Sequence, residues 1–295
     1  MVLDEMVDGS DECNRWVDEV FGDNVRFGLR VEREVYRAKS EYQEIRIVET
    51  QHFGRVLLLD GVFMTSEYDE FLYHELMVHP ALCSSAEVAR VVVIGGGDGG
   101  TVREVLRHSE VKRCAMVELD EMVVRACEVH LPTAGTSWGD PRLSMHFENG
   151  VTFMERLPVQ SVDVILVDGT DPVGAGASLF EPSFLSLCQR ALKPHGLFAI
   201  QTSSPILMMD QFLNAQSTLQ SIFRSVRPYF GPVPLYGTGV WSWTLCANTD
   251  SMPAPITERQ NTIAQMTRAY NQQVHAAAFA QPNFVRDALQ TLSKK

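Results

Sequence analysis

"GGGDGGTVRE", residues 95–104, follows the apolar run "RVVVI" of residues 90–94 and leads into a stretch with helical spacing. Gly95, Gly97 and Gly100 satisfy the G-x-G-x-x-G pattern of a strand-to-helix turn that binds nucleotides. Glu118 ends the next apolar run roughly 20 positions later, where an acid accepts hydrogen bonds from ribose hydroxyls. The order of strand, glycine loop, helix, strand and acid therefore predicts a nucleoside site.

Asp98, in the middle of this loop, restricts the kind of nucleoside. A dinucleotide would place its pyrophosphate against the loop and the helix N-terminus, where a carboxylate repels it. A nucleoside without phosphate, whose tail bears a sulfonium and an amine, would instead be stabilised by the opposite charge. The alternative interpretation is that Asp98 only caps the helix that begins near Thr101.

Further polar residues follow the third and fourth apolar runs. "HFENG", residues 146–150, places Glu148, Asn149 and Gly150 beside the predicted adenine position, and the side-chain oxygen of Asn149 can accept from the adenine amino group. A simple Asn-Gly turn explains the same residues. "ILVDGTDP", residues 165–172, ends a strand with Asp168 and Asp171, which suit a diammonium substrate and its proton, although Asp171-Pro172 also fits a turn.

The wider pattern predicts the architecture. Residues 26–64 alternate between apolar and polar residues, which indicates a small antiparallel sheet, and a helical stretch beginning near Phe71 follows. From residue 90 onward strands and helices alternate, which predicts a mostly parallel, Rossmann-like sheet. "PVPLYGTGVWSWTLCAN", residues 232–248, predicts an antiparallel pair at its edge. We place the domain boundary near residue 85, giving a β domain over 1–85 and a catalytic domain over 86–295.

Composition limits the partners. The formal net charge is −12, which disfavours nucleic acid and anionic membranes and favours a cationic small molecule, although an acidic balance also simply aids solubility. We expect a cytoplasmic protein, because no apolar run approaches a membrane span and the acidic N-terminus is unlike a secretory signal. The cysteines show no metal-ligand spacing, so we expect no metal site.

Several longer segments resemble one known family, the spermidine synthases or polyamine aminopropyltransferases. The matching segments are "YQEI" (42–45), "LDGVFMTSEYDEFLYHE" (59–75), "VIGGGDGGTVREVLRH" (93–108), "VELD" (117–120), "DVILVDGTDPVGAGASLF" (163–180), "VPLYG" (233–237) and "HAAAFAQP" (275–282). The paired aspartates and "YDEFLYHE" make the match far more specific than the glycine loop alone. The resemblance implies an N-terminal β domain, a Rossmann-like domain, and dimers or tetramers.

The resemblance also implies substrates and site residues. The donor would be decarboxylated S-adenosylmethionine, used as a co-substrate without any further cofactor or metal, and the acceptor a diamine, usually putrescine. The donor would contact Gln43, Gly95, Gly97, Asp98, Glu118, Glu148, Asn149 and Gly150. The acceptor would contact Tyr73, His74, Asp171, Gln201 and Tyr236. Asp168 would deprotonate the attacking amine.

Some residues depart from the family pattern. Asn149 stands where Asp is usual, Gly169 where Ser, Thr or Cys is common, and Ala175 where Pro is common, while Trp241 and Trp243 are unusually bulky. These differences concern acceptor identity more than reaction class. Three other functions remain as alternatives: a diamine N-methyltransferase using S-adenosylmethionine, a non-catalytic paralogue, and, last because of Asp98, a nicotinamide dehydrogenase.

Overall fold

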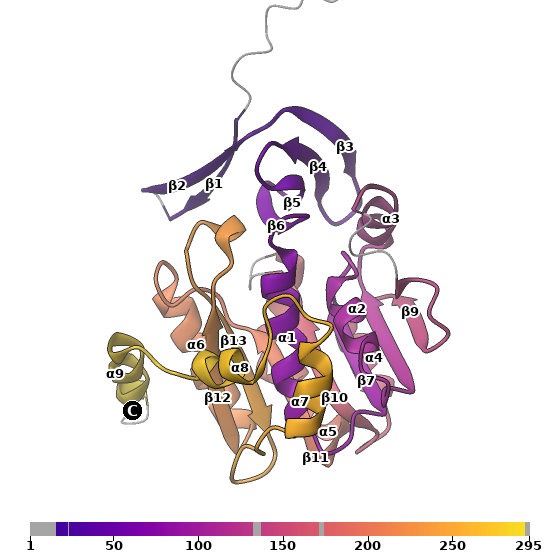
Figure 1. Ribbon diagram of the computed structural model, residues 1–295, viewed down its shortest axis with the longest axis vertical. Coiled ribbons are helices and arrows are strands. Elements are labelled where there is room, and N and C mark those ends of the chain that lie inside the picture. Colours follow the sequence, from indigo (N-terminus) through magenta and orange to yellow (C-terminus); the bar gives the residue numbers. More distant parts are fainter. Residues whose placement is uncertain (1–15, 23, 132–136, 171–173, 293–295) are drawn as a thin grey trace, which may run out of the picture.

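The computed structural model describes residues 16–22, 24–131, 137–170 and 174–292. The strands form three sheets, and Figure 1 shows the two small sheets together at one end of a larger sheet that helices cover. The small sheets are antiparallel, and the large sheet is mostly parallel with an antiparallel edge. The predicted fold class is therefore confirmed.

The N-terminal part contains two sheets where one was predicted. A hairpin of β1 (Trp16–Phe21) and β2 (Val25–Arg30) precedes a four-stranded antiparallel sheet of β3 (Arg33–Lys39), β4 (Glu44–Thr50), β5 (Gly54–Leu59) and β6 (Val62–Ser66). The prediction was wrong here because the chain bends at Glu32, which splits the alternating run after β2. Both faces of the four-stranded sheet are covered, since Ile45 and Ile47 pack toward helix α3 (Glu121–His130), and Val48 and Leu58 pack toward Leu235.

The large sheet has the order β12-β13-β11-β10-β7-β8-β9. Its strands are β7 (Arg90–Gly95), β8 (Arg113–Glu118), β9 (Leu143–Phe147), β10 (Val162–Asp168), β11 (Leu192–Gln201), β12 (Ser225–Gly231) and β13 (Trp241–Ala247). Strands β7 to β11 are parallel, and β13 is antiparallel to both β11 and β12. The order of connection reverses between β7 and β10, which is where open sheets of this kind bind ligands.

The antiparallel edge differs in detail from the prediction. Strand β13 lies within the predicted segment, but its partner β12 comes earlier in the chain, and Pro234–Tyr236 forms a single 3-10 turn, η3. The sequence "VPLYG" cannot extend as a strand because Gly237 turns in the left-handed region, with φ 66°, which favours glycine. This turn instead carries Tyr236 back toward the N-terminal sheet, where its hydroxyl reaches the Met64 carbonyl.

Helices cover both faces of the large sheet. The helices of the described residues are α1 (Glu70–Ser84), α2 (Gly100–Leu106), α3, α4 (Gly150–Arg156), α5 (Pro182–Ala191), α6 (Met209–Ile222), α7 (Thr257–Ala264), α8 (Gln272–Ala278) and α9 (Asn283–Leu292), which packs on α6, with a 3-10 helix η2 (Gly174–Phe180). One core cluster joins α1, α2, α7 and α8 to the sheet, and another joins α4, α5 and α6. Among the described residues, no helix has the length and apolar character needed to cross a membrane.

Helix α1 is the buried centre of this arrangement. It contacts α2, α7, β10 and β11, and Figure 1 shows it running from the small sheets along the large one. The Glu75 carboxylate accepts backbone N–H bonds from Arg268, Ala269 and Tyr270 at 2.7–2.8 Å, and the Tyr229 hydroxyl donates to the Leu76 carbonyl. The C-terminal segment thus fixes the helix that carries Tyr73 and His74.

Candidate active site

A cavity of about 150 Å³ lies where the carboxyl ends of β7, β8 and β10 meet the N-terminal sheet. Most of the predicted site residues line this cavity: Gln43, Tyr73, His74, Gly95, Gly97, Asp98, Glu118, Asn149, Gly150, Asp168 and Tyr236. Gln201 lines a smaller adjoining cavity. Glu148 lines neither, and Asp171 lies outside the described residues.

The glycine loop lies directly on the end of β10. Gly95 has φ 81°, and a Cβ built on it would lie 2.1 Å from the Asp168 carbonyl oxygen, so only glycine fits. The Gly96 N–H donates to the same carbonyl at 2.9 Å. The glycine here serves to bring two loops together, and it places Asp98 and Asp168 in one cavity.

Asp98 both accepts from the first N–H of α2, one residue before the N-cap Gly99, and faces the cavity. Its Oδ1 accepts from the Gly100 N–H at 2.8 Å, and its Oδ2 lies 3.2 Å from His74 Nε2. Burial alone would raise the pKa of Asp98, but the His74 charge and these hydrogen bonds lower it below its usual value. The two interpretations of Asp98 are therefore compatible, because the capping bond uses only one carboxylate oxygen.

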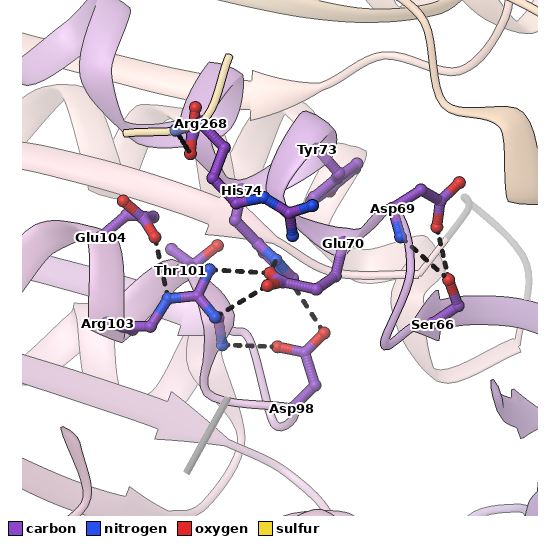
Figure 2. Close-up of polar contacts among 12 residues, drawn as sticks. Ser66, Asp69, Glu70, Tyr73, His74, Asp98, Thr101, Arg103, Glu104 and Arg268 are labelled. Carbon is purple, nitrogen blue, oxygen red and sulfur yellow. Dashed lines mark hydrogen bonds and ion pairs between the residues drawn. The ribbon is translucent and has the colours of Figure 1, made fainter. Parts of the chain in front are cut away.

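His74 is held between two carboxylates, as Figure 2 shows. Its Nδ1 lies 2.7 Å from Glu70 Oε2, one helical turn earlier, and its Nε2 faces Asp98. A Cβ on Gly100 would lie 2.2 Å from His74 Cε1, so this glycine makes room for the imidazole. One partner of His74 thus comes from the i, i+4 spacing on α1, and the other from the glycine loop.

Asp168 is held by neutral donors. Its Oδ1 accepts from the Tyr73 hydroxyl at 2.7 Å, and its Oδ2 accepts from the Thr101 hydroxyl at 2.6 Å. Burial and the nearby Asp98 charge raise the pKa of Asp168 above its usual value, although both hydroxyls and His74 oppose this. Thr101 was missed from the sequence, because its position after the glycine loop gives no sign that β10 ends beside it.

Glu118 and Asp120 form the side of the cavity nearest β8. Glu118 Oε1 accepts from the Asp120 N–H at 3.1 Å, and burial raises the pKa of Glu118 to about 7. Gln43, from the N-terminal part, donates to Asp120 Oδ2 at 3.1 Å. Leu57, Leu59, Ile94, Val117 and Leu179 supply apolar walls. This side offers hydrogen-bond acceptors beside a flat apolar space.

Glu148 and Asn149 differ in placement. Both Glu148 oxygens bond Arg156 Nη2, at 2.7 and 2.6 Å, which accounts for its absence from the cavity lining. Asn149 is the N-cap of α4, and its Oδ1 accepts from the Val151 N–H at 2.8 Å. The same Oδ1 also accepts from the Thr152 N–H at 3.4 Å, so both of its lone pairs take part in capping, while Asn149 still lines the cavity.

The smaller cavity, of about 40 Å³, extends from Tyr73 toward the β1-β2 hairpin. Tyr236 lies 5.9 Å from Tyr73 by ring centroids, and its hydroxyl donates to the Met64 carbonyl at 3.0 Å. Trp241 packs edge-on against Tyr236, and Trp243 packs behind Tyr73, so both tryptophans support the tyrosines. Glu19, also in the lining, was missed because nothing in the sequence links the hairpin to this site.

The charge of the main cavity is distinctive. Four carboxylates line it, from Asp98, Glu118, Asp120 and Asp168, and no Lys or Arg is among its described lining residues. Within the same described ranges, no group of three or more His, Cys, Asp and Glu residues is arranged to hold a metal ion. The arrangement therefore suits a cationic ligand with hydroxyl groups and a flat apolar part.

Comparisons with known proteins agree with this geometry. Residues 70–255 match the spermine/spermidine synthase domain, and residues 15–67 match the spermidine synthase tetramerisation domain. A polyamine aminopropyltransferase of Prochlorococcus marinus is 44% identical over 81% of this chain and 83% of its own length. One from Caldicellulosiruptor saccharolyticus is 37% identical over 95% of this chain and 99% of its own.

Solved structures give the same result. A crystal structure of a spermidine synthase in complex with the transition-state analogue AdoDATO has a TM-score of 0.90 and 34% identity, covering 95% of this chain and 98% of that one. The spermidine synthase of Thermotoga maritima has a TM-score of 0.88 and 33% identity, covering 95% of this chain and 97% of that one. Together, the two family matches reach from the β1-β2 hairpin to a point beyond β13.

Proposed function

This chain belongs to the spermine/spermidine synthase family and is a polyamine aminopropyltransferase; from this premise we propose that its donor is decarboxylated S-adenosylmethionine and its acceptor a diamine, most simply putrescine. The observation that carries the proposal is the main cavity, which has four carboxylates and, among its described lining residues, no Lys or Arg. Such a cavity attracts a sulfonium and ammonium groups and repels a pyrophosphate.

The donor fits the larger cavity by its chemistry. The tail amine pairs with Asp98, whose charge is fixed by its low pKa. The ribose hydroxyls donate to Glu118, and the adenine lies between apolar walls with its amino group toward Asn149. The donor's tail amine carries no neighbouring carboxylate, and this is what allows it to approach Asp98.

The acceptor occupies the smaller cavity in this proposal. Tyr236 has its hydroxyl proton committed to Met64, so it presents lone pairs to an ammonium group. Glu19, at the hairpin end of the cavity, suits the far ammonium of a diamine. Gln201 lines the same cavity, and its amide NH2 donates to the carbonyls of Gly169 and Thr170 at 3.4 Å. We also propose that Asp171 holds the acceptor's positive charge, as predicted from the sequence.

The reaction is an in-line displacement. The amine nitrogen forms a bond to the tail carbon next to sulfur, the carbon–sulfur bond breaks, and its electron pair stays on the sulfur of methylthioadenosine. An alkylammonium, with a pKa of about 10, has no free lone pair, so the acceptor must first lose a proton. Asp168 takes this proton in our proposal, since burial and the nearby Asp98 charge raise its pKa above the usual value.

A substrate panel tests the function. Purified protein is incubated with decarboxylated or ordinary S-adenosylmethionine and with putrescine, cadaverine, agmatine or spermidine, and products are read by mass spectrometry. We expect aminopropylated amine and methylthioadenosine from the decarboxylated donor, with putrescine giving the highest kcat/KM. Methylated amine from the ordinary donor would restore the methyltransferase alternative, and no turnover of any amine would overturn the proposal.

We also propose that the chain associates with further copies of itself. The match of residues 15–67 to a tetramerisation domain supports association, and Trp16 and Val20 on the hairpin are 56% and 53% exposed, as expected of an uncovered interface. We expect a homodimer or homotetramer, measured by light scattering, and a monomer at micromolar concentration would contradict this. A cytoplasmic location stays a prediction.

A further inference from the structure

A continuous line of charged side chains runs from helix α2 to the glycine loop (Figure 2). Arg103 donates from both terminal nitrogens to Glu70, at 2.9 and 2.8 Å. Glu70 faces His74 Nδ1 at 2.7 Å, and His74 Nε2 faces Asp98 at 3.2 Å. Arg103 Nε also donates to Glu104 at 2.8 Å. Charges therefore alternate along the whole line, which ends at the carboxylate proposed to hold the donor's amine.

This line is shielded from water along most of its length. Glu70 is 8% exposed, His74 is 2% exposed and Glu104 is fully buried, while the Arg103 side chain is 12% exposed. Buried charged groups are stable only when each is paired and hydrogen-bonded. The bidentate Arg103–Glu70 pair has the geometry that orients as well as binds. Each charged pair thus restricts the orientation of the next side chain along the line.

The two hydrogen bonds of His74 determine its protonation. A neutral imidazole has a single N–H, so it would turn the lone pair of its other nitrogen toward the carboxylate of either Glu70 or Asp98. That contact is repulsive, whereas an imidazolium donates from both nitrogens. Burial alone would lower the pKa of His74, but Asp98 and Glu70 raise it well above its usual value.

We propose that Arg103 and Glu70 are positioning residues for the donor: they hold His74 as an imidazolium against Asp98, so that Asp98 stays ionised and fixed in direction. The proposal rests on the proposed function, because Asp98 is assigned there to the donor's tail amine. Neither Arg103 nor Glu70 lines the cavity, so both act through His74. This arrangement also requires Gly100, since any side chain there would displace the His74 imidazole.

The other charged groups near His74 do not replace this line. Asp168 interacts with it through space and is oriented by Tyr73 and Thr101. Glu75, the next residue on α1, is committed to backbone N–H groups of the C-terminal segment. The described groups that face His74 directly are Glu70 and Asp98, with Arg103 behind Glu70 and the Tyr73 ring beside it.

Arg103→Met tests the positioning role by steady-state kinetics. We expect the donor KM to rise about tenfold while the acceptor KM stays within about twofold, since only the orientation of Asp98 is disturbed. Arg103→Lys keeps the charge but not the bidentate geometry, and we expect the donor KM to rise about threefold. The matched control is Arg107→Met, one turn along, which loses a contact to Glu104 but none to Glu70.

Glu70→Gln tests the protonation state directly. In the wild type, imidazole ¹⁵N resonances should show His74 doubly protonated from pH 6 to 8, with the signal assigned by His74→Gln. In Glu70→Gln the pKa of His74 should fall, so the Nε2 proton is lost as pH rises, and the donor KM should rise across the same range. This coupled change is one that a purely structural ion pair does not produce.

The outcomes separate this proposal from the function on which it rests. Wild-type protein that makes no aminopropylated amine refutes the function. Active wild-type protein with an unchanged donor KM in Arg103→Met, or with identical His74 titration in Glu70→Gln, refutes the positioning role alone. If Arg103→Met does not fold, as judged by its melting temperature, the Arg103→Lys kinetics and the Glu70→Gln resonances decide.

Discussion

Asp98 lies in the glycine loop and Asp168 ends β10, and both line the same cavity, but their pKa values are shifted in opposite directions. Asp98 faces His74 and the Gly100 N–H, while Asp168 accepts from the hydroxyls of Tyr73 and Thr101. Burial raises both pKa values, and the Asp98 charge raises that of Asp168 further. At Asp98 the His74 charge and the hydrogen bonds outweigh burial, whereas at Asp168 the two hydroxyls and the more distant His74 do not. A cationic partner keeps one carboxylate ionised, and neutral partners leave the other able to accept a proton.

The comparison also explains how two identical side chains can have separate tasks. A fixed negative charge suits binding, because it does not change when the cationic donor arrives. A carboxylate with a raised pKa suits proton transfer, because its basicity is closer to that of the amine. The difference comes from α1, whose neighbouring residues Tyr73 and His74 contact Asp168 and Asp98 respectively.

The largest effect is expected at Asp168, and it tests whether this residue is the general base. Asp168→Asn keeps the size and one acceptor oxygen but removes basicity, so we expect kcat at pH 7 to fall by about two to four orders of magnitude. Donor affinity, measured by calorimetry, should change little. Activity should recover partly toward pH 9, where the amine loses its proton more readily. Turnover near the wild-type rate at pH 7 would reduce Asp168 to a structural role.

The second prediction concerns Asp98 and donor choice. Wild-type protein should bind decarboxylated S-adenosylmethionine far more tightly than the ordinary form, whose extra carboxylate would face Asp98. Asp98→Asn should weaken binding of the decarboxylated donor by about 10- to 100-fold, and the two donors should then differ less in affinity. Calorimetric titration measures both. Equal affinity of the wild type for the two donors would contradict the assignment of Asp98 to the tail amine.

Glu118 sharpens the comparison, because it is a third carboxylate of the cavity, and no described Lys, Arg or His side chain pairs with it. Its pKa of about 7 means that it is partly protonated at neutral pH. Ribose hydroxyls favour the ionised form, so donor affinity should rise about tenfold between pH 6 and pH 8. Binding should also release a proton, seen by calorimetry in buffers of different ionisation enthalpy. In Glu118→Gln this pH dependence should disappear, and its persistence would place the titrating group elsewhere.

The smallest expected effect concerns Asn149, which caps α4 as well as facing the cavity. Asn149→Asp keeps the capping oxygen and should retain activity. Asn149→Leu should raise the donor KM severalfold and cost about 1 kcal/mol of stability through the lost cap.

Asn271→Leu is the control for the cap, since Asn271 caps α8 in the same way, accepting from Val274 N–H at 2.9 Å, outside the cavity lining. It should lower the melting temperature without changing the donor KM. A donor KM unaffected by Asn149→Leu would show that Asn149 is a cap only.

Much of the fold could be predicted from the sequence, since apolar runs such as residues 90–94 form buried parallel strands and glycines mark the loop after β7. Asp98, Glu118 and Asp168 were predicted as a group because each follows a strand of one parallel sheet, and such strand ends meet at one edge. The structure places these three side chains in a single cavity. Their roles stay predictions.

Other parts could not be predicted because they depend on packing between distant segments. Arg103 reaches Glu70 only because α1 lies against α2, and no local pattern encodes that contact. Glu19 lies on β1, which precedes the alternating run, and only the assembled fold brings it into the same cavity as Tyr236. The place of β12 was missed because Pro228 within it weakens the strand pattern.

The attachment of α1 to the end of the chain has a consequence for biosynthesis. Glu75 obtains its backbone partners from residues 268–270, which a ribosome makes nearly 200 residues after α1. Until those residues emerge, this buried carboxylate has no compensation, so helix α1 cannot settle with Tyr73 and His74 in place. Nascent chains should therefore hold a formed parallel sheet before they hold a working site, and truncation before residue 268 should remove activity more completely than it removes secondary structure.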